Sequence, residues 1–126
     1  LLRRLDPGSD ELEALLVDPS KPLFAPALLE AARWKFARAM PAVLDAAAKG
    51  PAAARRALAA AAAESGHLFV LRAAAPLLMD EDLEVRSDAW SAFLKHRPDQ
   101  VEGFDPKAGA AKRKPIVDAL LEALGR

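Results

Sequence analysis

The chain has 126 residues, enough for one domain with a buried core, and its 18 basic and 18 acidic side chains balance to a net charge of zero. Cysteine is absent, which excludes disulfides, thiolate catalysis and cysteine-ligated zinc. The charge balance argues against a domain whose whole surface attracts nucleic acid, although it leaves room for a local basic patch.

The composition also predicts the fold class. Thirty residues are Ala, the strongest helix former, whereas Val and Ile together number seven and Thr and Tyr are absent. A β-sheet would lack its preferred residues, so we expect an all-α chain. The bias towards Ala, Arg, Leu and Pro is typical of a GC-rich bacterial genome, and no apolar run approaches the roughly 20 residues that span a bilayer. We expect a cytoplasmic bacterial protein and, because Leu1 replaces an initiator Met, a piece of a longer one.

The first two predicted helices precede Pro41. Ser9 is a good N-cap for a helix over about 10–17, which Pro19 ends. A second helix is predicted over about 25–40, because its apolar residues recur at the spacing of one helical face. That apolar stripe consists of Ala25, Leu28, Leu29, Ala32, Phe36, Ala39 and Met40.

The middle of the chain predicts a short helix over 41–49 and an Ala-rich helix over about 51–64. Gly50 followed by Pro51 marks the boundary between them, since Gly suits a helix end and Pro suits a first turn. Ser65 and Gly66 end the Ala-rich helix.

Two further helices, over about 67–79 and 83–96, flank an acidic turn. Asp80 or Asp82 caps the second of them, and Pro98 follows it. The residues that we expect the first of these helices to point inward are Leu68, Leu71, Ala75 and Leu78.

The amino-acid composition changes after Arg97. Residues 98–114 contain Pro, Gly and a basic triplet but few large apolar side chains, which predicts a linker or a wrapping loop. Pro115 is then expected to start a C-terminal amphipathic helix over 115–126, which docks its apolar face in cis or on a neighbouring chain. That face consists of Ile116, Val117, Leu120, Leu121 and Leu124.

One spaced pattern occurs three times along residues 1–97. An apolar residue followed by Arg opens each copy, and further apolar residues follow on the same helical face. The copies are Ala32-Arg33-x-x-Phe36-x-x-Ala39-Met40, Ala54-Arg55-x-x-Leu58-x-x-Ala61-Ala62 and Val85-Arg86-x-x-Ala89-x-x-Ala92-Phe93. Pairing the predicted helices places each copy in the second helix of a hairpin.

The third copy lies in a segment that resembles the HEAT repeat. An apolar helix end is followed by Asp80 in the turn and by Val-Arg-x-x-Ala, which begins at Val85. The resemblance covers about 67–96 well and 9–65 in degenerate form. It implies a right-handed stack of about three helical hairpins, an α-solenoid, over 1–97. A compact helical bundle is the main alternative architecture.

Stacked hairpins would align the repeated arginines on one face. We predict that this face binds a partner protein, through Arg33, Trp34, Arg38, Arg55 and Arg56. The alternative is structural: the HEAT resemblance implies a ladder of arginines paired with turn carboxylates and helix ends, most firmly for Arg86. Similarly, Trp34 and Trp90 are either interface anchors or side chains packed between hairpins.

No residue pattern supports catalysis, a metal site or a cofactor. His67 and His96 match no metal-ligand spacing, and both are expected to be structural. The acidic run from Asp80 to Glu84 lacks the alternating ligands of a calcium loop, so capping explains it. Gly-rich phosphate loops and hydrolase motifs are missing.

The sequence therefore predicts a non-catalytic, protein-binding scaffold or adaptor. The alternative is a nucleic-acid-binding domain resembling the HEAT-like alkylpurine DNA glycosylases, which hold DNA in a basic groove with aromatics and a carboxylate. Asp88 and Trp90 beside Arg86 are the residues that would take such roles.

Overall fold

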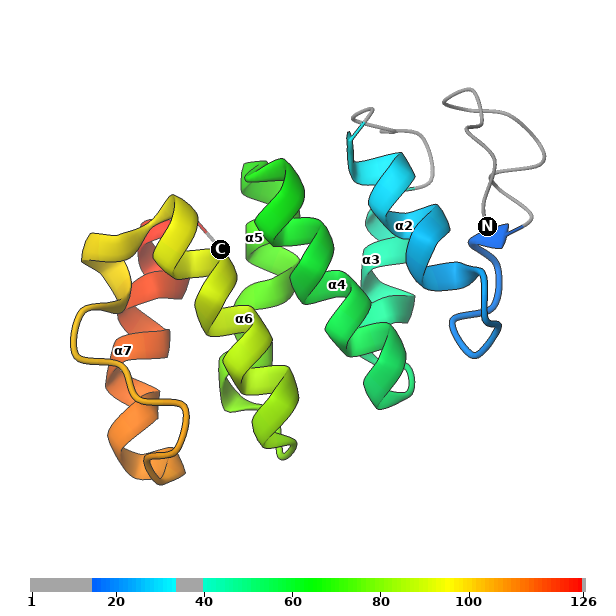
Figure 1. Cartoon of the computed structure of the whole chain (residues 1–126). Helices are drawn as coiled ribbons and strands as arrows, with labels where there is room; N and C mark the ends of the chain where they lie inside the picture. The colour runs from blue at the N-terminus through cyan, green and yellow to red at the C-terminus, as the bar shows by residue number, and fades with distance from the viewer. Residues whose placement is uncertain (1–14, 34–39, 126) are drawn as a thin grey trace.

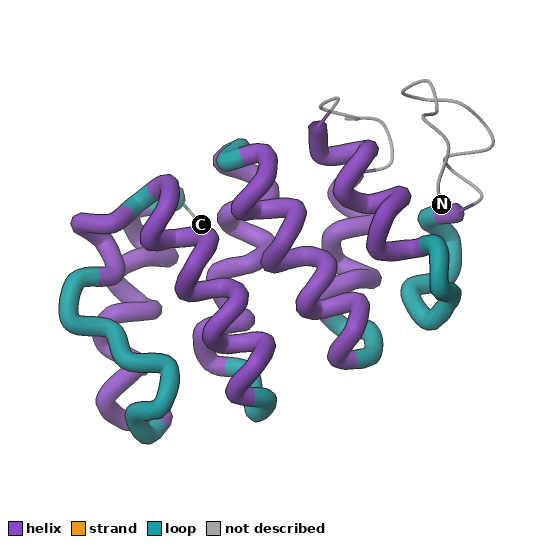
Figure 2. The backbone as a smooth tube through the Cα atoms, in the orientation of Figure 1, coloured by secondary structure: helices purple, strands orange, loops and turns teal. Residues whose placement is uncertain are grey.

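The computed structural model describes residues 15–33 and 40–125, with side chains described for 15–30 and 41–125. Over these ranges the chain is all-helical and has no strand, as the composition predicts (Figure 2). The elements are α2 (Phe24–Arg33), α3 (Met40–Ala48), α4 (Ala52–Ser65), α5 (Leu68–Ala74), the 3-10 helix η1 (Ala75–Met79), α6 (Leu83–His96), the 3-10 helix η2 (Pro98–Val101) and α7 (Ala110–Ala123). None of these helices is long and apolar enough to cross a membrane.

The described helices form two layers. Figure 1 shows α2, α4 and α6 side by side, with α3, α5 and α7 behind them. Helix α4 packs against α2 on one side and α6 on the other. Reversals on either side of α4 make α3 and α5 run in the same direction.

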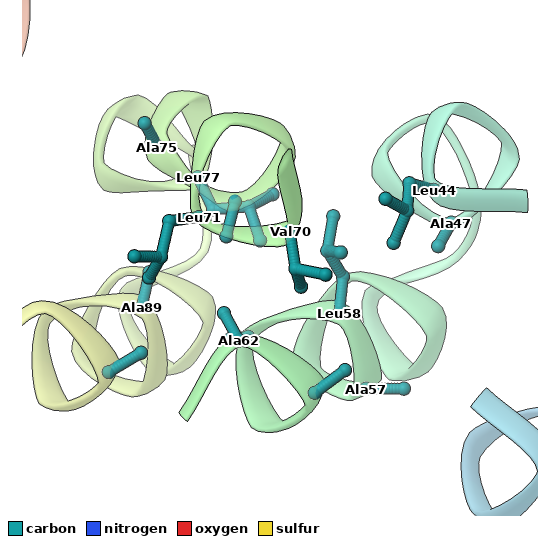
Figure 3. Packing of buried hydrophobic residues seen from close by; sticks show 14 of the residues in the cluster. Leu44, Ala47, Ala57, Leu58, Ala62, Val70, Leu71, Ala75, Leu77 and Ala89 are labelled. Carbon is teal, nitrogen blue, oxygen red and sulfur yellow. The ribbon is translucent and has the colours of Figure 1, made fainter. Parts of the chain in front are cut away.

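Small side chains bring the front helices together. Six buried residues of α4, among them Ala57, Ala61 and Ala62, are all Ala except Leu58. Between the layers, Leu58 rises from α4 between Val70 of α5 and Leu44 of α3 (Figure 3). Alanine-rich faces permit close helix approach, while the larger aliphatic side chains fill the space behind them.

Two helix ends show how local sequence sets the boundaries. Asp82 is the N-cap of α6, where its Oδ1 accepts hydrogen bonds from the backbone N–H groups of Glu84 and Val85. Gly66 ends α4 with a φ of +66°, a left-handed conformation that favours glycine. Both boundaries were expected from the sequence.

The C-terminal helix differs from the sequence-based expectation. Helix α7 begins at Ala110, so the expected start at Pro115 is wrong by five residues and Pro115 lies inside the helix. Residues 110–114 contain strong helix formers, and these outweigh the loss of one backbone donor at an exposed Pro. Val117, Leu120 and Leu124 are buried, and α7 packs against η1 and η2. This is docking in cis.

Part of the predicted N-terminal half lies outside the described residues. Most of the helix expected over 10–17 does so, as does the segment 34–39. Helix α2 matches the start of the second predicted helix, and Met40, which was expected at the end of that helix, belongs to α3. Leu68 is also exposed, where the sequence suggested burial. Instead α5 buries Val70, Leu71 and Ala74.

Candidate functional site

The predicted partner-binding face is only partly described. The side chains of Arg33, Trp34 and Arg38 lie outside the described residues. Arg55 and Arg56 belong to the first turns of α4 and can be placed.

Arg55 is held within the structure. Its Nε lies 2.9 Å from Asp80 Oδ2, and its side chain is 19% exposed against 11% for Asp80. The Nε–H is not directed at an acceptor, so charge holds this contact. Nη2 donates to Asp80 Oδ1 at 3.4 Å and Nη1 donates to the Gly50 carbonyl at 2.8 Å. Arg55 therefore joins α4 to the turn before α6, which matches the structural alternative.

Arg56 is half-exposed but is not a free cation. Its Nε donates to Asp88 Oδ2 at 2.7 Å and its Nη1 donates to Glu84 Oε2 at 3.0 Å. The hydrogen bond and charge of Asp88, followed by the charge of Glu84, raise the pKa of Arg56. This surface of α4 and α6 is electrically compensated, so it has little attraction for an acidic partner.

Arg86, the arginine of the third copy of the pattern, forms its hydrogen bonds with backbone carbonyls. Arg86 Nη1 donates to the carbonyl of Asp80 at 2.7 Å and Nε donates to the carbonyl of Pro106 at 2.8 Å. The sequence suggested that Arg86 would pair with the Asp80 carboxylate, but Arg55 occupies that group. Arg55 and Arg86 thus each contact the loop before their own helix and the loop before a later one, which is the turn before α6 for Arg55 and the loop before α7 for Arg86.

Arg113 continues this arrangement in α7. It is 7% exposed; Nε donates to the Ala108 carbonyl and Nη1 donates to the Leu78 carbonyl, both at 2.8 Å. Burial, and then the charge of Arg86, lower the pKa of Arg113. This buried, structural role of Arg113 was not predictable from the sequence, because Arg113 lies between two exposed lysines in the basic triplet.

The remaining polar and aromatic candidates are also structural. His96 Nε2 lies 2.7 Å from the Ala63 carbonyl, which links the last turns of α6 and α4. The ring of His67 stacks on Phe69 at 5.6 Å, and Trp90 is half-buried with its ring 6.4 Å from that of Phe104. Within the described ranges, no three His, Asp or Glu side chains converge on a potential metal position.

A groove lies between α3 and α5 on the described surface. Its volume is about 750 Å³, within the range of roughly 300–1,000 Å³ seen for ligand pockets. Its lining residues are Pro41, Leu44, Asp45, Ala48, Lys49, Phe69, Arg72, Ala73 and Pro76.

One stripe of each helix supplies a wall of the groove. On α3 the lining positions recur from Pro41 to Lys49 at helical spacing, and the wall formed by α5 and η1 repeats this from Phe69 to Pro76. Phe69 is 38% exposed, a large amount for an aromatic side chain. The end that holds Pro41 and Phe69 is apolar, whereas the charged side chains lie farther along the two helices.

Sequence reasoning missed this groove. It assigned one inward stripe to the helix over 67–79 and left its other apolar positions without a role. The available signal was a second apolar set on the same helix, made of Phe69, Ala73 and Pro76. A helix with apolar residues on two faces packs on the core with one and leaves the other for a further contact.

Comparison of the chain with family models, with curated proteins and with solved structures finds no match.

Proposed function

We propose that this chain is a non-catalytic, protein-binding scaffold built from stacked helical hairpins that resemble HEAT repeats. The groove between α3 and α5 is the observation that carries the proposal. It combines an exposed Phe69 with aliphatic and Pro side chains, and such apolar concave surfaces are typical of interaction sites.

The arrangement of the hairpins supports the repeat interpretation. The helices α2, α4 and α6 follow one another in chain order within one layer (Figure 1). Arg55 and Arg86 occupy equivalent sequence positions, and each reaches both the loop before its own helix and the loop before a later helix. This order favours a stack, in which each hairpin contacts its neighbours, over a bundle around one axis.

A matched pair of variants tests the proposal. Ala73→Glu places a charge in the groove, whereas Ala60→Glu places the same charge on the exposed surface of α4. Proteins captured from an extract of the source organism by the unmodified chain should be retained by Ala60→Glu and lost by Ala73→Glu. Quantitative mass spectrometry measures the recovery, and circular dichroism checks that both variants fold. Equal recovery by all three chains would reject the groove as a protein-binding site.

The nucleic-acid alternative has less support. Arg55 and Arg56 are paired with carboxylates, Asp88 is engaged by Arg56, and Trp90 packs against Phe104. A phosphate backbone would have to displace these carboxylates. Binding to duplex DNA at low salt that weakens steeply as salt rises would reverse this preference, because phosphate contacts release counterions.

A further inference from the structure

We infer that the groove between α3 and α5 receives an amphipathic helix of a partner protein, with apolar side chains against Leu44 and Phe69 and a carboxylate beside Arg72. This inference rests on the proposed function and specifies the chemistry of the partner.

The shape of the groove favours a helix. Its two walls run in the same direction, and each presents about two helical turns, or roughly 10 Å of length. A helix laid between them would place side chains from successive turns against the walls, as in helix-in-groove recognition. A folded helix can present its apolar face to the groove and its polar face to solvent, which a single acyl chain cannot do.

The charges along the groove favour an acidic occupant. Lys49 Nζ lies 3.2 Å from Asp45 Oδ2, so these two exposed side chains compensate each other. Arg72 has no carboxylate within ion-pair distance among the described residues. Its Nε donates to the carbonyl of Leu124, and its Nη2 lies near Gly125. Among the described lining residues, Arg72 therefore supplies a positive charge that no described carboxylate neutralises, and a carboxylate on the partner would complement it.

Two synthetic peptides of about 12 residues, roughly three helical turns, provide the probe. Both carry the same stripe of leucines, flanked by glutamate in one peptide and by lysine in the other. Fluorescence anisotropy with the full chain should give a Kd about fivefold lower for the glutamate peptide, the scale of one partly exposed ion pair. Phe69→Ala should weaken the binding of both peptides.

Two substitutions locate the charge preference. Arg72→Gln should bring the two Kd values to within about twofold of each other. Because this change also removes the hydrogen bond to Leu124, Ala73→Glu serves as a second variant that leaves Arg72 in place. It should shift the preference towards the lysine peptide. The matched control Arg56→Gln lies on the front layer and should keep the original preference.

Several results would overturn the inference. These are binding of neither peptide at about 1 mM, a preference unaffected by Arg72→Gln and Ala73→Glu, and binding unaffected by Phe69→Ala. Dodecanoate that binds the groove while both peptides fail would identify a small-molecule site instead. If protein capture depends on Ala73 but the peptides are not discriminated, only the inference fails. If capture is insensitive to Ala73→Glu, the proposed function fails as well.

Discussion

At the scale of single residues, Asp80 links three segments of the chain. Its Oδ2 faces Arg55, its Oδ1 accepts a hydrogen bond from the Asp82 backbone N–H, and its carbonyl accepts one from Arg86. One short acidic side chain thus fixes the turn before α6 and connects it to α4. The ion pair is mostly shielded from water, so it is worth more than a surface pair.

Asp80→Ala should therefore lower the free energy of unfolding by about 2 kcal/mol, because Arg55 would keep its burial but lose its carboxylate partner. Urea denaturation followed by circular dichroism measures this change. Asp45→Ala is the matched control, since Asp45 pairs with Lys49 where the side chains are 65% and 75% exposed. That control should change stability by less than about 0.5 kcal/mol. Equal losses in the two variants would show that the Arg55–Asp80 pair is not stabilising.

Gly66 illustrates a backbone requirement at the same scale. Its φ is +66°, and an added Cβ would lie 2.6 Å from His96 Cε1. Gly66→Ala should destabilise the chain by about 2 kcal/mol, through left-handed strain and the clash with His96. Thermal melting gives the measurement.

Gly109→Ala is the corresponding control. Gly109 has a φ of −65°, and nothing lies within 4 Å of its added Cβ. Its substitution should alter stability by less than about 0.5 kcal/mol, as reduced freedom of the unfolded chain offsets a poorer N-cap. A Gly66→Ala chain as stable as this control would contradict the assigned role of Gly66.

At the scale of elements, the boundaries of α6 were predictable from sequence and the start of α7 was not. Helix α6 has a strong N-cap at Asp82 and a Pro directly after Arg97, so local chemistry marks both ends. Pro106, Gly109 and Pro115 suggest a loop up to residue 114, but residues 110–114 are good helix formers. Arg113, which donates to the Leu78 carbonyl, is buried in that added part of the helix. Helix propensity and a tertiary contact together therefore outweigh the boundary that Pro115 suggests.

The same distinction applies to the candidate site. Repeated spacing identified the arginines, but spacing cannot tell a carboxylate partner from a backbone carbonyl, as Arg86 and Arg113 show. The groove depends on how far α3 and α5 stand apart, which is a property of the assembled layers. No local pattern around Phe69 or Arg72 contains that distance.

The position of Pro115 leads to a test at this scale. Pro115 lies inside α7, is exposed, and cannot donate to the carbonyl one turn earlier. Pro115→Ala should raise the free energy of unfolding by about 1–2 kcal/mol, less than the full helix-interior penalty because Ala also frees the unfolded chain. Chemical denaturation measures the gain. Pro51→Ala, at the N-cap of α4, should bring no gain because no helical hydrogen bond is lost there. A destabilised Pro115→Ala chain would contradict this account.

At the scale of the whole molecule, α7 completes the rear layer and covers η1. Leu77 and Leu78 of η1 are 3% and 0% exposed, and α7 lies against this segment. Arg113 and Arg86 add polar links between α7, its preceding loop and the helices before it. The C-terminal segment is therefore part of the folded unit.

Truncation after Arg97 should lower the melting temperature by at least about 10 °C, because the buried side chains of Val117, Leu120 and Leu124 each contribute roughly 1.5–3 kcal/mol. The point variant Leu120→Ala should cost about 2–5 kcal/mol and tests the same contact without removing a segment. Differential scanning calorimetry follows both. A truncated chain that melts with the full chain would show that α7 adds no stability.

The unequal spacing within the two layers has a mechanical consequence. The front helices meet through alanines, with α4 in close contact with α2 and α6, whereas α3 and α5 flank a groove. A small rotation of one hairpin about α4 would leave the alanine contact nearly unchanged but widen or narrow the groove. A change in how strongly the two layers curve would then also change the width of the groove. An occupant that wedges α3 and α5 apart would bend the molecule. Bending imposed elsewhere would in turn change the affinity of the groove for that occupant.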